Sequence, residues 1–172
     1  MTTTSYNSLR YGDVSLTSSG KVLQVVTATS TAAFSSSSST YVDLTGITAN
    51  ITPASTSNKI MIYAVITLQN NDDVNHAYAL LKRDTTTLII ADTASNRTCA
   101  SMVVSGTATL EHPPRGFTFL DSPNTTSEVT YKIQVKGSNT NGIYMNRSQG
   151  DNNAAANDGR SASTFTLMEI SG

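Results

Sequence analysis

The stretch from Val129 to Lys136 constrains the fold of this chain most, because apolar and polar residues alternate along it without interruption. In an extended chain, successive side chains point to opposite sides, so this pattern predicts a β-strand with one buried and one solvated face. The apolar residues of the stretch are Val129, Tyr131, Ile133 and Val135. Turn residues dominate the flanking segments 120–124 and 137–142, and short apolar segments lie beyond both turns. The second half of the chain is therefore expected to form a meander of three antiparallel strands.

Similar short apolar segments recur along the rest of the chain. Clusters of Ser, Thr, Asn, Gly and Pro separate them, and no segment shows the 3.6-residue apolar periodicity of an amphipathic helix. Short strands at this spacing predict an all-β fold, a single antiparallel β-sandwich that is jelly-roll-like. The expected strands cover residues 21–26, 41–44, 47–51, 59–68, 76–84, 87–91, 101–104, 117–119, 129–136, 143–144 and 163–170.

The composition agrees with this fold and argues against several classes of function. Ser, Thr and Asn make up more than a third of the chain, which suits strand surfaces and turns and disfavours helices. Charged residues amount to 13%, the net charge is -1 and no basic run exists, so no nucleic-acid partner is expected. No apolar run approaches the length of a membrane span, so no membrane partner is expected either. The single cysteine, Cys99, is expected to be buried.

The first 20 residues differ from the remainder of the chain, because their few apolar side chains are too widely spaced to form a core. We therefore divide the chain into an N-terminal arm, residues 1–20, and a β-sandwich domain, residues 21–172. A partner surface is the natural place for the apolar side chains of the arm, which we expect to anchor the protein to that surface; a frayed terminus is the alternative. The expected anchor residues are Leu9, Tyr11, Val14 and Leu16.

The longest apolar segment, residues 59–68, is apolar on both of its predicted faces. One face holds Ile60 and the residues at every second position after it, and the other holds Met61, Tyr63 and Val65. A strand of this kind is either central in a sandwich or packed against another subunit. We accordingly expect a homotrimer or another symmetric oligomer, with Met61, Tyr63 and Val65 as its candidate interface.

No pattern of acidic, histidine or nucleophilic residues indicates an enzyme. Glu111, Glu128 and Glu169 are the only glutamates, and none lies beside another acidic residue. The histidines, His76 and His112, lie in different segments and have no neighbours at metal-ligand spacing. The sequence therefore predicts a protein with no catalytic residues, no metal site and no cofactor.

Exposed loops at the ends of the predicted sandwich are the expected place for any binding site. Residues 148–158 form the longest of these polar segments, and the serine run from Ser35 to Ser39 is expected to be a second solvated loop. Tyr144, Asn146 and Arg147 lead into the long loop, and their side chains are a candidate set for contacting a glycan.

Several segments in a fixed order resemble a group of virion proteins from tailed phages, frequent among marine and cyanobacterial viruses. Members of this group are described as tail-fibre-like or as virion structural proteins. The resemblance covers about residues 20–172, and no motif in it is catalytic. It rests on Gly-Lys-Val-Leu-Gln-Val-Val at 20–26, Leu-Thr-Gly-Ile through Ile-Thr-Pro-Ala-Ser-Thr-Ser-Asn at 44–58, Phe-Leu-Asp-Ser-Pro at 119–123, Thr-Tyr-Lys-Ile-Gln at 130–134, Tyr-Met-Asn-Arg-Ser at 144–148 and Ser-Thr-Phe-Thr-Leu-Met-Glu-Ile at 163–170.

The resemblance implies a structural protein on the virion surface, made in the cytoplasm of the bacterial host. It also implies that the partner surface of the arm, residues 1–20, belongs to the virion. Its expected partners are other copies of itself, other capsid or tail proteins of the phage, and a glycan on the host surface. Two roles follow from this: a fibre or receptor-binding head domain, or a capsid decoration (cement) protein that stabilises the shell. The family description favours the fibre head, whereas the short segment ahead of the domain favours decoration.

Overall fold

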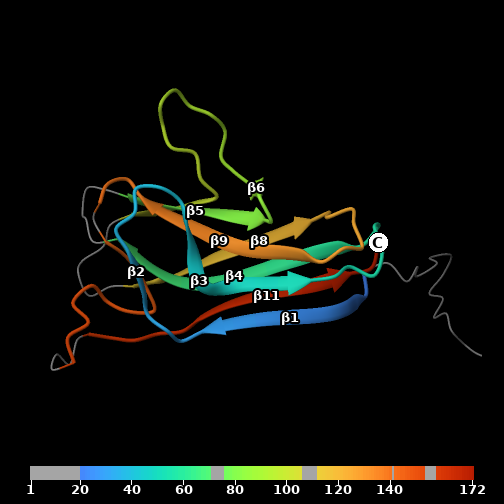
Figure 1. Cartoon of the computed structure of the whole chain (residues 1–172), viewed down its shortest axis with the longest axis horizontal. Helices are drawn as coiled ribbons and strands as arrows, with labels where there is room; N and C mark the ends of the chain where they lie inside the picture. Colours follow the sequence, from blue (N-terminus) through green and yellow to red (C-terminus); the bar gives the residue numbers. More distant parts are fainter. Residues whose placement is uncertain (1–19, 71–75, 106–111, 141, 154–157) are drawn as a thin grey trace, which may run out of the picture.

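Two antiparallel β-sheets contain all the strands of the computed structural model, which describes residues 20–70, 76–105, 112–140, 142–153 and 158–172 (Figure 1). No helix that could cross a membrane occurs in these described ranges. The strands are β1 (Val22–Ser30), β2 (Phe34–Ser36), β3 (Val42–Ile51), β4 (Lys59–Asn70), β5 (His76–Arg83), β6 (Thr86–Ile89), β7 (Met102–Ser105), β8 (Pro114–Asp121), β9 (Val129–Gly137), β10 (Ile143–Met145) and β11 (Ser163–Ile170).

The first sheet is built around β4, the strand that lies at its centre. β8 pairs with one edge of β4, and the other edge pairs with β11 along its first half and with β10 near its end. β1 pairs with the far edge of β11, and the short β2 pairs with the far edge of β10. Read across the sheet, the order is therefore β8–β4–β11–β1, with β10 and β2 continuing the same layer at one end.

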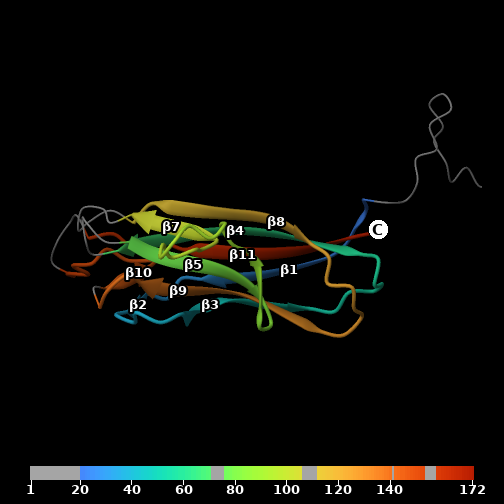
Figure 2. The same cartoon turned by 90° about the horizontal axis from the view of Figure 1, so that it is seen from above.

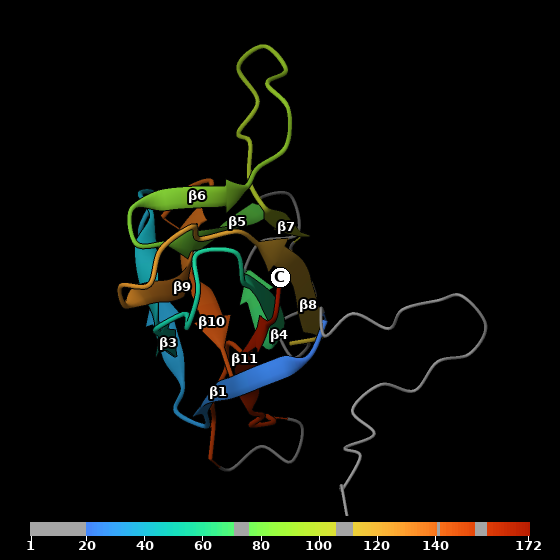
Figure 3. The ribbon, with the colours of Figure 1, turned by 90° about the vertical axis from the view of Figure 1, so that its right-hand side faces the viewer.

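The second sheet has the order β3–β9–β5, and both β6 and β7 pair with the free edge of β5. Figures 2 and 3 show the two sheets as stacked layers, with β1, β11, β4 and β8 in one and β3, β9 and β5 in the other. Successive strands along the chain mostly alternate between the sheets, and the first strand ends beside the last. This arrangement of two interleaved Greek keys is the jelly roll, so the predicted fold class is confirmed.

The alternation that predicted β9 places its side chains as expected. Its apolar residues, including Tyr131 and Ile133, lie completely or almost completely inside the sandwich, and the residues between them point outward. β4 contributes the opposite wall of the core through Ile60, Ile62 and the further residues in the same register. The core is therefore made by inward-facing residues of the central strands of both sheets.

A polar cluster also joins the two layers. The carboxylate of Asp121, at the end of β8, pairs with the guanidinium of Arg83 on β5 at 2.6 Å and accepts a hydrogen bond from the Tyr131 hydroxyl at 2.7 Å. Burial, and then the hydrogen bond to Asp121, raise the pKa of Tyr131 far above its ordinary value. The phenol therefore stays protonated and serves as a hydrogen-bond donor inside the sandwich.

Three local predictions are wrong, each for an identifiable reason. A single strand, β3, replaces the two strands expected at 41–44 and 47–51. Gly46 adopts a φ of +85°, and the register of the β3–β9 pairing shifts between Asp43 and Thr48 without ending the strand. The serine run does not form only a loop, since Ser35 and Ser36 belong to β2 and pair with β10. Residues 69 and 70, which lie beyond the expected strand 59–68, extend β4 and are buried.

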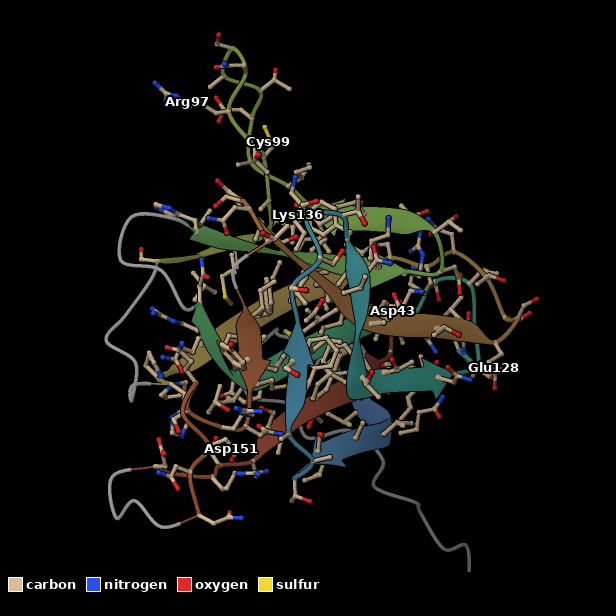
Figure 4. The ribbon with its side chains drawn as sticks, turned by 60° about the vertical axis from the view of Figure 1, so that its left-hand side comes forward. Asp43, Arg97, Cys99, Glu128, Lys136 and Asp151 are labelled. Atoms are coloured by element: carbon tan, nitrogen blue, oxygen red, sulfur yellow. The ribbon has the colours of Figure 1, made fainter. Side chains whose placement is uncertain are left out.

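Cys99 also differs from its predicted placement. Figure 4 shows it with Arg97 on the segment between β6 and β7, which projects away from both sheets. The thiol is half-buried and lies 3.1 Å from the carbonyl oxygen of Asp92 in the same segment. Cys99 was expected in the core because an unpaired cysteine usually behaves as a small apolar residue. In the structure its thiol contacts the backbone of its own segment instead.

Candidate functional site

Of the three residues that the sequence grouped as a candidate glycan-contact set, the structure brings Tyr144 and Arg147 together and buries Asn146. Tyr144 lies in the middle of β10, between the buried Ile143 and Met145, so its side chain points to the outer face of the first sheet. Arg147 follows in the loop, half-buried, with its guanidinium carbon 5.0 Å from the centre of the Tyr144 ring. Asn146, between them, is completely buried.

Asn146 is held inside the protein by four side-chain hydrogen bonds. Its amide nitrogen donates to the carbonyl oxygens of Ser30, at 2.8 Å, and Ala32, at 3.0 Å. Its amide oxygen accepts from the hydroxyls of Thr67, at 3.0 Å, and Ser163, at 2.6 Å. The backbone φ of 61° lies in the left-handed region, which asparagine tolerates better than most residues. Asn146 therefore connects β1, β4 and β11 at one end of the sandwich and is not available to a ligand.

Tyr144 instead lines an open hollow of about 320 Å³ on the outer face of the first sheet, where β2 pairs with β10. The register places Tyr144 directly opposite Ser35. Gly142 leaves room for the Tyr144 ring, because a Cβ atom at residue 142 would overlap the end of this ring in its present position. The residues that line the hollow are Ser35, Ser36, Ser37, Gly142 and Tyr144.

The loop beside the hollow is fixed by its own charged side chains. Arg147 donates hydrogen bonds to the carbonyl oxygens of Ser148, at 2.9 Å, and Gln149, at 2.8 Å. Its guanidinium also lies 3.4 Å from the carboxylate of Asp151, which pairs at 2.6 Å with Arg160 from the returning strand of the loop (Figure 4). The Arg147 guanidinium beside the Tyr144 ring is therefore held in place by hydrogen bonds and an ion pair within the loop.

The segment 148–158 was expected to be solvated throughout, and this is wrong at both of its ends. Ser148 is completely buried, and its hydroxyl donates a hydrogen bond to the Asp158 carboxylate at 2.6 Å. The same carboxylate accepts a hydrogen bond from the backbone N–H of Asn152 at 2.7 Å. The hydrogen bond from Ser148, and then that from Asn152, lower the pKa of Asp158. Residues 154–157 lie outside the described residues.

Chemically, the hollow offers hydroxyl groups and one aromatic ring, and no charged side chain lines it. Such a surface suits a neutral polyhydroxyl ligand, which can exchange hydrogen bonds with serine hydroxyls and pack its C–H groups on a ring. No group of three His, Cys, Asp or Glu side chains with the spacing to hold a metal ion occurs in the described part of the chain.

The glutamates considered as possible catalytic acids lie in different environments. Glu169 is 1% exposed, and its carboxylate accepts hydrogen bonds from the side chains of Asn58 and Gln24 and from the backbone of Ala54. Burial alone would raise the pKa of Glu169, but these three hydrogen bonds together outweigh it and lower the pKa. Glu128 lies at an exposed turn, and Glu111 falls outside the described residues. Glu169 therefore has the environment of a structural carboxylate.

The candidate interface residues Met61, Tyr63 and Val65 do share one surface, the outer face of β4. Tyr63 is 48% exposed, and the other two are half-buried by neighbouring strands. Sequence reasoning missed the partners that the fold brings to this face from β1 and β8, namely Val22, Leu23, Val25 and Leu120. Only pairing between strands that are distant in sequence places them on the same sheet face as β4, so no local pattern could have found them. The candidate anchor residues Leu9, Tyr11, Val14 and Leu16 lie outside the described residues.

Comparison with known proteins finds a likeness among solved structures. No family model matches the chain, and no curated protein matches it. Among solved structures, the chain is similar to VP2 of infectious bursal disease virus, as seen in the crystal structure of a VP2 subviral particle, with 16% sequence identity and a TM-score of 0.46. The match covers 99% of this chain and 50% of the VP2 chain, so this chain spans about half the length of that protein. A likeness at this level carries no functional argument, and the fold assignment rests on the strand order itself.

Proposed function

We propose that the chain is a non-enzymatic structural protein of a tailed-phage virion, and that it serves as a receptor-binding head exposed on the particle. The observation that supports this role is the hollow between β2 and β10, where hydroxyl groups surround one side of the Tyr144 ring. The virion location is supported by the resemblance of residues 20–172 to virion proteins. Jelly rolls occur in both capsid proteins and lectins, so the fold is compatible with either part of the proposal.

The expected ligand is a glycan of the host surface. A sugar presents hydroxyls around an apolar ring face, and the hollow presents serine hydroxyls beside an aromatic ring. The hollow is open rather than enclosed, so a single chain would bind weakly, and several copies on one particle would raise the avidity. Tyr144 is the residue that contributes most contact area, since the other four lining residues are serines and a glycine.

Binding of the purified protein to a panel of bacterial surface glycans tests the ligand. We expect one class of glycan to bind, and Tyr144→Ala to weaken that binding by about tenfold, the loss expected for one aromatic contact. Tyr63→Ala is the matched control, because it removes a tyrosine that is more exposed than Tyr144 from the same sheet outside the hollow. Absence of binding across the panel, or equal losses in the two variants, would refute the receptor-binding role.

A capsid decoration protein is the second candidate, favoured by the apolar outer face around Met61 and Tyr63. A decoration protein binds a shell through an extended surface and needs no ligand site. Electron cryomicroscopy of intact particles distinguishes the two roles: density at fibre tips supports the receptor-binding head, and regular density over the capsid shell supports decoration. Absence of the protein from purified particles would contradict both.

A further inference from the structure

The outer faces of the two sheets have different chemistry. On β9, in the second sheet, every outward-facing residue is polar, and Lys132 forms an ion pair with Asp43 at 2.9 Å. On the first sheet, the outward positions level with residues 59–65 of β4 hold mainly apolar residues and threonines. We call these positions the near half of the first sheet. Lys59 is the only charged residue among them in the described chain, and its amino group donates a hydrogen bond to the Ser122 hydroxyl at 2.7 Å. The near half is therefore a neutral surface.

Apolar side chains form a row across the near half, one from each of four strands. Strand pairing places them side by side, although they come from separate parts of the sequence. Both ends of the row are open to solvent, since Val25 on β1 is 56% exposed and Leu120 on β8 is 50% exposed. A contiguous apolar patch of this kind is typical of an interaction surface. The row consists of Val25, Met168, Met61 and Leu120.

Tyr63 gives the near half an uneven relief. It lies on β4 one level from the row, is 48% exposed, and pairs with Thr166 on β11 and Thr118 on β8. A ring between two short side chains stands above them and leaves lower surface on both sides. A closely fitting partner must therefore offer large and small side chains in neighbouring rows. The near half itself has this property, because its apolar row lies beside a row of threonines.

The size of the near half suits a second copy of the chain. Four strands spaced by about 4.8 Å, each contributing about seven residues at about 3.3 Å, give a flat area of roughly 450 Å². Two copies that meet there bury about twice this area, and the relief of the side chains raises the accessible area further. The total reaches the roughly 1,000 Å² that a specific interface needs. It lies at the small end of stable interfaces, so association at about micromolar concentration is expected.

Charge also permits a second copy. When a surface meets its own copy, each charge lies close to an equal charge, and such repulsion costs affinity. The near half carries only Lys59, at its border, so two copies bring no cluster of like charges together. The outer face of the second sheet could not pair with itself in this way, because Lys132 and Lys136 both lie on β9.

The far half of the same face restricts how the second copy can lie. Thr67, further along β4, is an outward-facing residue that is buried by hydrogen bonds to Asn146 and Ser161. The loop that carries these residues therefore stands on the outer face. Two copies with their strands in the same direction would bring these loops against each other. With the strands reversed, each loop lies beyond the end of the partner's near half.

We propose that a second copy of this chain binds the near half, with the two first sheets stacked face to face. The two-fold axis crosses the strands between the levels of Met61 and Tyr63, so the apolar row of each copy faces the row of threonines and Tyr63 of the other. This narrows the symmetric oligomer expected from sequence to a dimer, and it does not depend on the proposed function. Tyr144, opposite Gln69, lies eight residues from Met61 along β4, about 26 Å away. Tyr63→Ala should therefore weaken the dimer and leave the affinity of each hollow for a glycan unchanged.

The mass of the protein in solution tests the dimer. Light scattering at about 50 micromolar should give twice the 18.2 kDa of one chain. Val25→Glu should raise the dissociation constant at least about a hundredfold, because the interface then holds two unpaired carboxylates. Ile90→Glu is the matched control and should remain a dimer, since Ile90 is 53% exposed outside the near half. Circular dichroism checks that both variants are folded. An unaltered chain with the mass of one copy, whose near half something else must cover, or of three copies would overturn the proposal. An intact dimer of the folded Val25→Glu variant would overturn it as well.

Single cysteines test the orientation of the two copies. With Cys99→Ser as background, Thr27→Cys on β1 and Thr118→Cys on β8 are each treated with a short thiol cross-linker. Both are exposed positions at the level of Tyr63, and a two-fold axis across the strands places each beside its own copy. We expect covalent dimers from each variant alone and none from Thr48→Cys, an exposed threonine on the outer face of the second sheet. Cross-links that form only in a mixture of Thr27→Cys and Thr118→Cys would show parallel strands and overturn the proposed arrangement.

Discussion

Asn146 gives the sharpest test of how this sandwich is held together at its loop end. Replacing it with alanine removes four side-chain hydrogen bonds, to Ser30, Ala32, Thr67 and Ser163. At about 1 kcal/mol for each lost hydrogen bond, this amounts to about 4 kcal/mol. Alanine also tolerates the φ of 61° less well, which adds about 1 kcal/mol. The expected loss of about 5 kcal/mol is a large share of the stability of an ordinary domain.

Urea unfolding followed by circular dichroism measures this loss. Asn146→Gly should be less destabilising than Asn146→Ala by about 1 kcal/mol, because glycine relieves the backbone part and leaves the hydrogen-bond part. Asn153→Ala, in an exposed position of the same loop, is the control and should change stability by less than about 0.5 kcal/mol. If Asn146→Ala and Asn153→Ala cost the same, Asn146 does not connect the strands and the reasoning is refuted.

Three further predictions concern the core, a buried carboxylate and a glycine. Ile133→Asp should prevent folding, because an unpaired carboxylate in the core costs several kcal/mol. The control Lys132→Ala changes an outward-facing residue and should lower the free energy of unfolding by less than about 1 kcal/mol. Equal losses of stability in urea unfolding would show that the assigned facing of β9 is wrong. Because the pKa of Glu169 lies below its ordinary 4.5, its contribution is complete above that pH and is lost as the pH falls through the folded-state pKa. Glu169→Gln should remove this part of the acid sensitivity, and parallel stability curves between neutral and acid pH would contradict it. Gly46→Ala should destabilise by about 1–3 kcal/mol, because its φ is +85° and its new Cβ would lie 2.8 Å from the Ser30 hydroxyl; the double variant with Ser30→Ala should recover only the steric part, and full recovery would refute the backbone contribution.

The elements that could be predicted from sequence are those whose pattern is local. The alternation of 129–136 and the two-sided apolar segment at 59–68 gave β9 and β4 with correct inner faces. Gly46 suggested a chain break because a glycine with left-handed φ also occurs in turns, and only the pairing with β9 shows that it is a bulge. The strand β2 has no apolar alternation of its own, and it exists because β10 offers a free edge beside it.

The candidate site was less predictable because its residues acquire their roles from distant partners. Asparagine is typical of loops, so nothing in the sequence indicated that Asn146 is buried. Its burial depends on Ser30, which lies 116 positions earlier in the sequence. The apolar outer face around Met61 depends on four strands whose adjacency follows from the jelly-roll order rather than from any local signal. Tyr144 lies beside Arg147, as their closeness in sequence suggests, but the serines of β2 that also line the hollow come from a distant part of the chain.

The strand β4 carries two separate regions on its outer face. This face is open at Met61 and Tyr63, but Thr67 is buried because it bonds with Asn146 and with Ser161. The loop that carries Asn146 thus covers the far half of the face whose near half is apolar and open. In the β4 register, Met61 pairs with Leu120 and Gln69 lies opposite Tyr144, so eight residues, about 26 Å, separate the apolar region from the hollow. At that separation the two regions share no contact, and the effects on stability of changing Met61 and of changing Tyr144 should be additive.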